Sequence, residues 1–295
     1  MTAERPTAAQ PVAHTAGSAA WHDPCNVADA DRTPGADRPW AVSSDAAHLP
    51  PMIDSTMDGD IATLWLARGA ARNALPTRGW CALAERVADL AASDTRAVIL
   101  ASREPGIFSA GADIAEFAEL QRDPARRTRF REQLSAAIEG IAALPMPVIA
   151  AVDGGCFGAG VALMLACDIA IAGDAARFAV PPARLGILYP PADVARLVAA
   201  VGRGHAARLL YSGDTIDADA ALAIGLVQER SGDPLAAAQA MAQRFAANAR
   251  QAVRGLKQAI DGVPHGEARF DAAFGGTELQ EGLAAFCERR PPVFR

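Results

Sequence analysis

Two glycine-containing turns are the places where the sequence could bring backbone groups to a ligand. Phe108–Ile114 (FSAGADI) follows an apolar segment that ends at Ala101, and Gly154–Gly160 (GGCFGAG) follows one that ends at Val152. Glycine permits a sharp turn and a close approach of the backbone to a ligand. A helix that begins at Ala159 would direct free N–H groups and the positive end of its dipole toward that ligand. Two such N–H groups on one oxygen form an oxyanion hole, so the turns predict stabilisation of a developing negative charge.

Other ligand-binding and nucleophile motifs do not fit these turns. Gly158 and Gly160 lack the third glycine of a dinucleotide-binding fingerprint, because position 163 is Leu163. The sequence contains no GxxxxGK[ST] phosphate loop, and Ile107 stands where a nucleophile elbow around Ser109 would need glycine. Taken alone, each turn could also be only a tight connection between a strand and a helix.

Apolar segments alternate with helical periodicity in the region that contains the turns. Four such segments are predicted strands: Ile61–Leu66, Ala97–Ala101, Pro147–Val152 and Asp168–Ala172. Apolar residues at helical spacing predict helices at 77–92, 129–144 and 161–167, and beyond Pro190 at 193–201, 205–212, 217–224, 234–261 and 270–290. Strands that alternate with helices predict an α/β fold with a parallel sheet, followed by a helical C-terminal part.

The composition limits the classes of protein to which the chain can belong. Of its 295 residues, 51% are hydrophobic and 21% are charged, which predicts a buried core. The net charge of -6 gives no support for a nucleic-acid partner, and no stretch approaches the roughly 20 apolar residues of a membrane span. The five cysteines include no CxxC pair, so we expect neither disulfides nor a metal site, and a reducing, cytoplasmic location.

Residues 1–50 differ in composition from the rest of the chain. Six of the 20 prolines lie there, and no helical or alternating apolar pattern persists. The segment also lacks the basic patch and apolar stretch of a secretory signal. We therefore predict a disordered N-terminal extension.

Several segments resemble the crotonase superfamily, the enoyl-CoA hydratase/isomerase group. They are FSAGADI, PVIAAVDGGCFGAGVALMLACDIAIAG, ARFAVPPARLGI, RNAL (72–75) and EGLAAFCERRPPVF (281–294). The resemblance covers residues 61–294 with the segments in family order. It implies a ββα spiral core over 51–232 and a C-terminal helical region over 233–295. It also implies acyl-CoA thioester substrates, no separate cofactor because coenzyme A enters with the substrate, and a homotrimer or a dimer of trimers.

The same resemblance implies a set of site residues. The thioester carbonyl would lie between the backbone N–H groups of Ala112 and Ala159. Coenzyme A would be bound by residues that act mainly through their backbone, with one aromatic side chain contributed from the helical tail across a subunit contact: Ala70, Ala71, Arg72, Ala110, Ala112, Asp113, Ile114, Ala159 and Phe274.

Two positions depart from the hydratases of this family. Those enzymes carry one glutamate at the position of Ala162 and a second at the position of Pro182. Adding water to a double bond requires groups that activate the water and deliver a proton, and neither alanine nor proline can do so. We therefore expect no hydratase activity of the usual kind.

A few polar side chains remain as candidates near the expected pocket. Tyr189 lies in PARLGILY, whose P-x-x-L-G-x-x-Y pattern resembles the methylmalonyl-CoA decarboxylase branch, although that branch keeps the first glutamate. Its hydroxyl could orient a carboxylate or donate a proton, or it could simply pack under a loop. Asp193 could be an acid or base, or the N-cap of the helix that follows. Glu116 and Glu119 could face the pocket, or solvent.

Three hypotheses follow from these residues. The first is an enzyme that forms a thioester enolate for decarboxylation or a proton shift, using Ala112, Ala159 and Tyr189. The second is an unconventional hydratase or isomerase with Asp193, Glu116 or a bound water as its acid or base. The third is a protein that binds acyl-CoA without turnover.

Overall fold

A six-stranded sheet forms the centre of the structure, a computed structural model that describes residues 51–294 of the chain. The predicted disordered extension, residues 1–50, lies outside the described residues. β1 runs antiparallel to β2, and every other neighbouring pair in this sheet is parallel. In sheet order the strands are β1 (Ile53–Asp58), β2 (Ile61–Leu66), β3 (Ala97–Ser102), β5 (Val148–Val152), β7 (Ile169–Ala172) and β10 (Glu229–Arg230).

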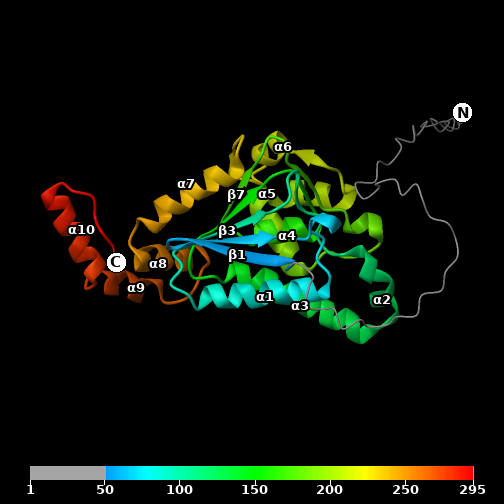
Figure 1. The fold of residues 1–295 in the computed structure, drawn as a ribbon, viewed down its shortest axis with the longest axis horizontal. Helices are drawn as coiled ribbons and strands as arrows, with labels where there is room; N and C mark the ends of the chain where they lie inside the picture. Colours follow the sequence, from blue (N-terminus) through cyan, green and yellow to red (C-terminus); the bar gives the residue numbers. More distant parts are fainter. Residues whose placement is uncertain (1–50, 295) are drawn as a thin grey trace, which may run out of the picture. The chain divides into compact units, whose positions relative to one another are not determined.

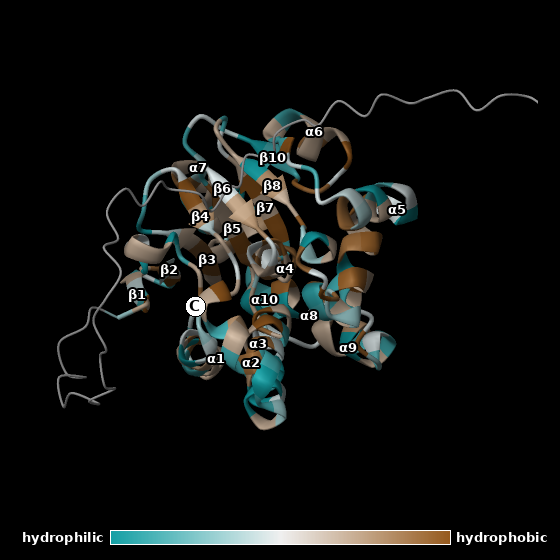
Figure 2. Ribbon diagram, turned by 90° about the vertical axis from the view of Figure 1, so that its right-hand side faces the viewer, coloured by the Kyte–Doolittle hydropathy of each residue, from teal (hydrophilic) through white to brown (hydrophobic). Residues whose placement is uncertain are grey.

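Helices cover both faces of this sheet, which explains why its central strands are almost wholly apolar. On β3, Val98 and Leu100 pack toward one core cluster, whereas Ile99 packs toward the other. The first cluster lies under α1 (Thr77–Ala91), α3 (Pro124–Ala142) and α4 (Ala159–Leu165), and the second under α7 (Pro234–Ala246). Figure 1 shows α7 on one side of the sheet and α1 and α3 on the other. Figure 2 shows the hydrophobic colour on the central strands β3, β5 and β7. A strand buried on both faces reads as a continuous apolar run, and the predicted α/β fold is confirmed.

A second, smaller sheet joins the segments that carry the two glycine turns. Its order is β4 (Ile107–Ser109), β6 (Gly155–Phe157), β8 (Arg177–Ala179) and β9 (Ile216–Asp217). β4 pairs in parallel with β6, and β6 pairs in parallel with β8. The sequence did not predict these strands because two or three residues are too few to show an alternating period.

The remaining helices differ from the predicted ones mainly at their breaks. The two helices predicted for 193–201 and 205–212 are joined in α5 (Pro191–Ser212), with a backbone break at Gly202 (φ 74°, ψ 161°). The single helix predicted for 234–261 is two helices, because Ala249 is non-helical with ψ 117°. The other helices are η1 (Gly69–Ala71), η2 (Ile114–Glu116), α2 (Phe117–Arg122), η3 (Pro182–Leu185), α6 (Ala218–Ala223), α8 (Arg250–Ile260), α9 (Gly266–Ala273) and α10 (Thr277–Glu288).

The C-terminal helices are attached to the end of the sheet where the strands begin. Lys257 of α8, the chain's single lysine, is itself buried and forms an ion pair with Asp168, the residue before β7. The second carboxylate oxygen of Asp168 accepts a hydrogen bond of 2.7 Å from the N–H of Val148, the first residue of β5. The glycine turns follow the opposite ends of the strands, and Figure 1 shows α8, α9 and α10 far from α2, which follows the first turn. No helix within residues 51–294 has the length and apolar character needed to cross a membrane.

Candidate active site

The first glycine turn lies alongside residues 72–75. The N–H of Leu75 donates to the carbonyl of Gly111 at 2.7 Å, and the N–H of Asp113 donates to the carbonyl of Leu75 at 3.0 Å. The N–H of Ala110 donates to the backbone carbonyl of Arg72 at 2.9 Å. Ala112 lies between these bonds, and its own N–H donates to no group in the described part of the chain.

A buried asparagine holds this turn in place. Asn73 is inaccessible to solvent and has a left-handed backbone (φ 56°). Its side-chain amide donates to the carbonyl of Phe108 at 3.0 Å and to the hydroxyl of Ser102 at 2.7 Å. The hydroxyl of Ser109 then links its neighbours, because it donates to the carbonyl of Asn73 and accepts from the N–H of Gly111, both at 3.0 Å. The sequence analysis missed Asn73 as a positioning residue, and the RNAL motif was the only pattern that included it.

The second glycine turn opens α4. Gly158 has φ 53° and ψ −122°, a conformation that a residue with a Cβ adopts only under strain. Its N–H donates to the carbonyl of Ala179 at 2.9 Å, which ties the turn to β8. Ala159 is the first residue of α4, and its N–H also donates to no described group. A free N–H at a helix start carries the positive end of the helix dipole.

The two turns interlock through their glycines. A Cβ on Gly111 would lie 2.6 Å from the carbonyl oxygen of Phe157 and 2.7 Å from the nitrogen of Ala159. A Cβ on Gly160 would lie 2.7 Å from the carbonyl oxygen of Ser109. Only glycine fits at either position, so the contact brings the backbone of Ala159 against the turn that carries Ala112.

Most of the residues predicted to bind coenzyme A gather beside the first turn. Ala70 and Ala71 form η1, and Arg72 follows in the left-handed conformation (φ 53°). Asp113 accepts from the guanidinium of Arg68 at 2.7 Å and from the N–H of Ala115 at 3.1 Å, which caps η2. Together with Ala110 and the exposed Ile114, these residues lie on or beside the first turn and are all at least partly exposed, and we call them the surface patch.

Phe274 does not join this patch. It is the C-cap of α9 and is 65% exposed, and Phe270 of the same helix packs edge-on against it. α9 follows α8, which is anchored where β5 and β7 begin. The chain's own Phe274 therefore lies at the opposite end of the sheet from Ala112 and Ala159.

The two positions that lack glutamate are buried, and the hydroxyl of Tyr189 lies beside one of them. Ala162, in the first turn of α4, is 1% exposed, and Pro182 at the start of η3 is also buried. The hydroxyl of Tyr189 donates to the carbonyl of Gly158 at 3.0 Å and lies by the backbone of Ala162. Burial raises the pKa of Tyr189 well above its usual value, and the charge of Asp193 raises it further. A phenol with this pKa stays protonated and can act as a hydrogen-bond donor.

Asp193 is buried, and its charge acts on the hydroxyl of Tyr189. It lies in the first turn of α5, with its side chain 4% exposed, and Arg196 donates to its carboxylate at 3.0 Å. The pKa of Asp193 is raised to about 6, chiefly by burial. The cation of Arg196 lowers this pKa, and the charge of Glu139 raises it. Asp193 is not the N-cap, because α5 begins two residues earlier at Pro191 and has no side-chain cap. This carboxylate changes its protonation close to neutral pH.

The carboxylates of the other two candidates, Glu116 and Glu119, are bonded to other side chains or backbone groups. One carboxylate oxygen of Glu116 accepts from the N–H and hydroxyl of Thr77, at 2.7 and 2.8 Å, and so caps α1. Glu119 is exposed and pairs with Arg126. Burial raises the pKa of the Cys156 thiol well above its usual value, which leaves it unreactive. Within residues 51–294, no cluster of three or more His, Cys, Asp or Glu side chains could hold a metal ion.

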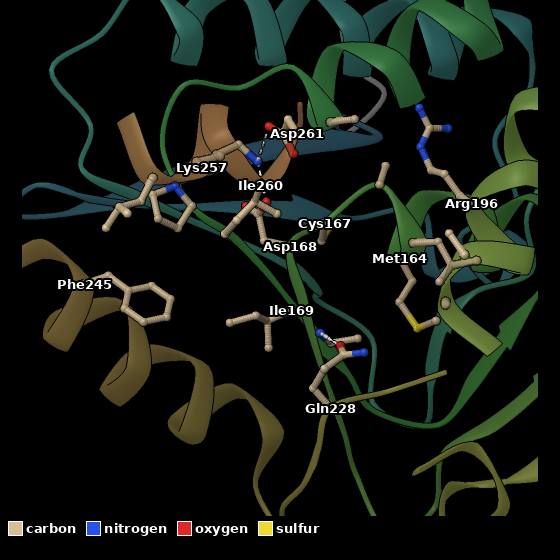
Figure 3. A pocket seen from close by; sticks show the side chains of 18 of the residues that line it. Met164, Cys167, Asp168, Ile169, Arg196, Gln228, Phe245, Lys257, Ile260 and Asp261 are labelled. Carbon is tan, nitrogen blue, oxygen red and sulfur yellow. Dashed lines mark hydrogen bonds and ion pairs between the residues drawn. The ribbon is translucent and has the colours of Figure 1, made fainter. Parts of the chain in front are cut away.

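A cavity of about 760 Å³ lies at the other end of α4, away from the glycine turns. The end of α4, the starts of β5 and β7, and α5 and α8 form its walls. Figure 3 shows Lys257 close to Asp168 and Asp261 on one side of this cavity and Arg196 on the other. None of the predicted site residues lines it, and its charged side chains are already paired with one another or with Asp193 and Glu139.

Known proteins share this arrangement. The family model described as enoyl-CoA hydratase/isomerase matches residues 56–295. The mitochondrial methylglutaconyl-CoA hydratase of Mus musculus is 32% identical over 252 residues, which cover 80% of this chain and 79% of that protein. The 2,3-dehydroadipyl-CoA hydratase of Escherichia coli (strain K12) is 33% identical over 247 residues, which cover 80% of this chain and 95% of that protein.

The solved structures agree with the sequence comparison. An enoyl-CoA hydratase/isomerase family protein from Hyphomonas neptunium matches with a TM-score of 0.80 at 32% identity, over 83% of this chain and 97% of that one. The matched part includes the sheet, both glycine turns and the C-terminal helices, and it confirms the predicted crotonase-like fold. The chain belongs to the enoyl-CoA hydratase/isomerase family of the crotonase superfamily.

Proposed function

We propose that the chain binds an acyl-CoA thioester and stabilises the enolate that forms from it. The supporting observation is the pair of free N–H groups, on Ala112 and Ala159, in two turns that interlock through Gly111 and Gly160. The thioester oxygen accepts a hydrogen bond from each N–H group. When a bond to the α-carbon breaks, its electron pair moves toward that oxygen, and the two donors and the α4 dipole stabilise the negative charge.

The surface patch beside the first turn is the proposed coenzyme A site. Ala70, Ala71, Arg72, Ala110, Asp113 and Ile114 would contact the adenine and pantetheine mainly through backbone groups. The ion pair between Arg68 and Asp113 fixes the turn between them, so the site is formed before the ligand arrives. A preformed site binds with a smaller loss of conformational entropy.

The acid and base groups that remain favour decarboxylation or a proton shift over hydration. No carboxylate occupies position 162 or 182, and the protonated hydroxyl of Tyr189 lies beside Ala162. In a decarboxylation the bond from the α-carbon to the carboxylate breaks, carbon dioxide leaves, and a proton must reach the α-carbon. Tyr189 would orient the carboxylate or deliver that proton, a task that one hydroxyl can perform.

Exchange of the acyl α-proton with deuterium tests this proposal, because it detects the enolate even where no product forms. We expect exchange with at least one member of a panel of acyl-CoA and carboxyacyl-CoA thioesters. Tyr189→Phe should slow exchange or decarboxylation about 100-fold, the usual effect of losing a general acid. The matched control is Tyr211→Phe, since Tyr211 is the chain's other tyrosine and is 79% exposed. Equal rates for both variants and the wild type would exclude Tyr189 from the reaction.

Hydration or isomerisation with Asp193 as the acid or base is the second candidate function. Its support is a buried carboxylate with a pKa of about 6 beside Tyr189, together with relatives that are named hydratases. Exchange or hydration that persists in Tyr189→Phe but stops in Asp193→Asn would favour this function. Saturable binding of acyl-CoA with no exchange under any condition would favour a binding protein without turnover.

We also propose that the active assembly is a homotrimer or a dimer of trimers. The chain's own C-terminal helices lie away from its glycine turns, so Phe274 could contact coenzyme A only in another copy. The apolar side chains that α8–α10 expose support such packing: Leu256, Ile260, Phe270, Phe274, Leu283 and Phe286. Sedimentation of the purified chain tests the assembly, and a monomer that retains full activity would contradict it.

A reducing cytoplasm is the compartment that we propose for this assembly. Four free cysteines lie within the described residues, at Cys81, Cys156, Cys167 and Cys287. Proteins of oxidising compartments usually pair such thiols.

A further inference from the structure

The carboxylate of Asp193 is buried in a setting that supplies one compensating charge. Its side chain is 4% exposed, and burial without a partner would drive a carboxylate to its neutral form. Arg196, one helical turn farther along α5, donates to it at 3.0 Å. The pairing favours the ionised form of Asp193, whose charge acts on the hydroxyl of Tyr189.

Arg196 forms ion pairs with two carboxylates, those of Asp193 and Glu139. Its second guanidinium nitrogen donates to the carboxylate of Glu139 on α3, at 2.5 Å. The ion pairs therefore join α3 and α5 through one cation shared by two carboxylates. Glu139 is 49% exposed and Arg196 is 21% exposed, so the network runs from solvent to a buried group.

Among residues 51–294, Arg196 is the charged group that pairs with Asp193. α4, which packs against α5, contains only apolar residues and glycine. η3 contributes Arg184, which is engaged with the carbonyl of Ser212 and the carboxylate of Asp214. The titratable groups nearest to Asp193 are Arg196, Glu139 and Tyr189, with Cys156 beyond Tyr189.

We propose that Arg196 is a positioning residue that holds the Asp193 carboxylate ionised beside Tyr189, and that Glu139 regulates it by sharing the cation. This inference rests on the proposed function, in which the proton of the enolate is handled by Tyr189 or, in the second candidate function, by Asp193. Losing Arg196 leaves Asp193 buried without a counter-charge and favours its protonated form. Losing Glu139 removes a negative neighbour and frees the cation, so it favours the ionised form.

Two variants with opposite expected shifts test the proposal. Arg196→Met should move the titration midpoint of Asp193 upward by about one pH unit or more, and Glu139→Gln should move it downward. The midpoint is measured by carbon-13 NMR on the full chain with labelled aspartate, where Asp193→Asn identifies the resonance. Arg196→Lys keeps the charge and should return the midpoint toward the wild-type value. A structural role alone would not produce shifts of opposite sign.

The pH profile of α-proton exchange separates this proposal from the proposed function. If exchange occurs and its midpoint follows the NMR midpoint in each variant, both proposals are supported. If the NMR midpoints shift while no thioester exchanges, the proposed function fails and the role of Arg196 in holding Asp193 stands. If Glu139→Gln, a change at a half-exposed residue that should not impair folding, leaves the NMR midpoint at the wild-type value, the inference about Arg196 and Glu139 is overturned.

Discussion

The two glycine turns and the segment around Ala162, Pro182 and Tyr189 would contribute to the proposed site in different ways. The turns act through backbone N–H groups and through the absence of Cβ atoms at Gly111 and Gly160. The other segment acts through side chains, and there the two glutamate positions of the hydratases hold alanine and proline. Under the proposed function, the backbone groups that would bind a thioester oxygen are therefore present, whereas the side chains that would move protons differ from those of the hydratases.

Under the proposed function, this difference would let one fold keep a substrate class and change its reaction. An oxyanion hole stabilises any enolate or related anion of a thioester, whatever acid or base produces it. Replacing the side chains that move protons leaves the hole unchanged. In this chain the hydroxyl of Tyr189 lies by the backbone of Ala162, and the charge of Asp193 acts on that hydroxyl.

The largest expected effect comes from blocking the contact between the turns. Gly111→Ala should slow α-proton exchange about 100-fold or more, because its Cβ would lie 2.7 Å from the nitrogen of Ala159 and must push the two N–H groups apart. The left-handed φ of 86° adds strain to any residue with a Cβ. Exchange is measured by NMR in deuterium oxide, with binding of acyl-CoA measured in parallel.

Gly262→Ala is the matched control for this substitution. Gly262 also has a positive φ, 69°, but a Cβ there would meet no atom within 4 Å. It should therefore lose some stability and keep its exchange rate. If both variants exchange at the wild-type rate, the interlocked turns do not form the catalytic site, and the contrast between the two regions disappears.

The second prediction concerns the side-chain part and its dependence on pH. The pKa of Asp193 is about 6 in the folded chain and 3.8 for an unperturbed aspartate, the value expected in the unfolded chain. As the pH rises, the unfolded chain therefore loses this proton first. Folding stability therefore falls between about pH 4 and pH 6, by about 3 kcal/mol for a shift of about two units. Asp193→Asn cannot titrate, so its stability relative to the wild type should rise by that amount between pH 3.5 and pH 7.5 in urea unfolding. A constant difference across this range would show that Asp193 is not buried as described.

The sequence predicted the backbone part of the site better than the side-chain part. The apolar runs of β3 and β5 are continuous because both faces of the sheet are covered, and the glycines of the turns mark the ends of β4 and β6. These are local properties of short segments. The sequence predicted a ligand-binding turn at Gly158 and Gly160 without any knowledge of the contact of this turn with Ser109 and Gly111.

The side-chain part depends on partners that are remote in sequence. Glu139 reaches Arg196 from 57 residues away, and Glu116 reaches Thr77 from 39 residues away. Neither distance leaves a pattern in one sequence. The sequence therefore favoured a helix cap at Asp193 over an acid or base, and the start of α5 at Pro191, the burial of Asp193 and its pairing with Arg196 exclude the cap.

A third prediction examines what supports the first turn. Asn73→Ala should destabilise the chain by about 2 kcal/mol, because it leaves the N–H of Arg68 and the carbonyl of Phe108 buried without the partner that Asn73 provides. Asn248→Ala, at an exposed asparagine, should change the stability by less than about 0.5 kcal/mol. Unfolding in urea measures both. Equal stabilities would mean that the turn is held by Ser109 and the second turn alone.

The smallest effect separates a structural glutamate from a catalytic one. Glu116→Ala should lower the stability by about 1 kcal/mol, the usual effect of losing a helix cap, because Glu116 accepts from the N–H and hydroxyl of Thr77. Its α-proton exchange should stay within about twofold of the wild type, since less than about 0.5 kcal/mol of transition-state stabilisation is then lost. Glu119→Ala, which removes an exposed ion pair, should change neither quantity measurably. A 100-fold loss of exchange in Glu116→Ala with unchanged stability would instead make Glu116 the acid or base, and the side-chain part of the site would then lie on the helix after the first turn rather than around Tyr189.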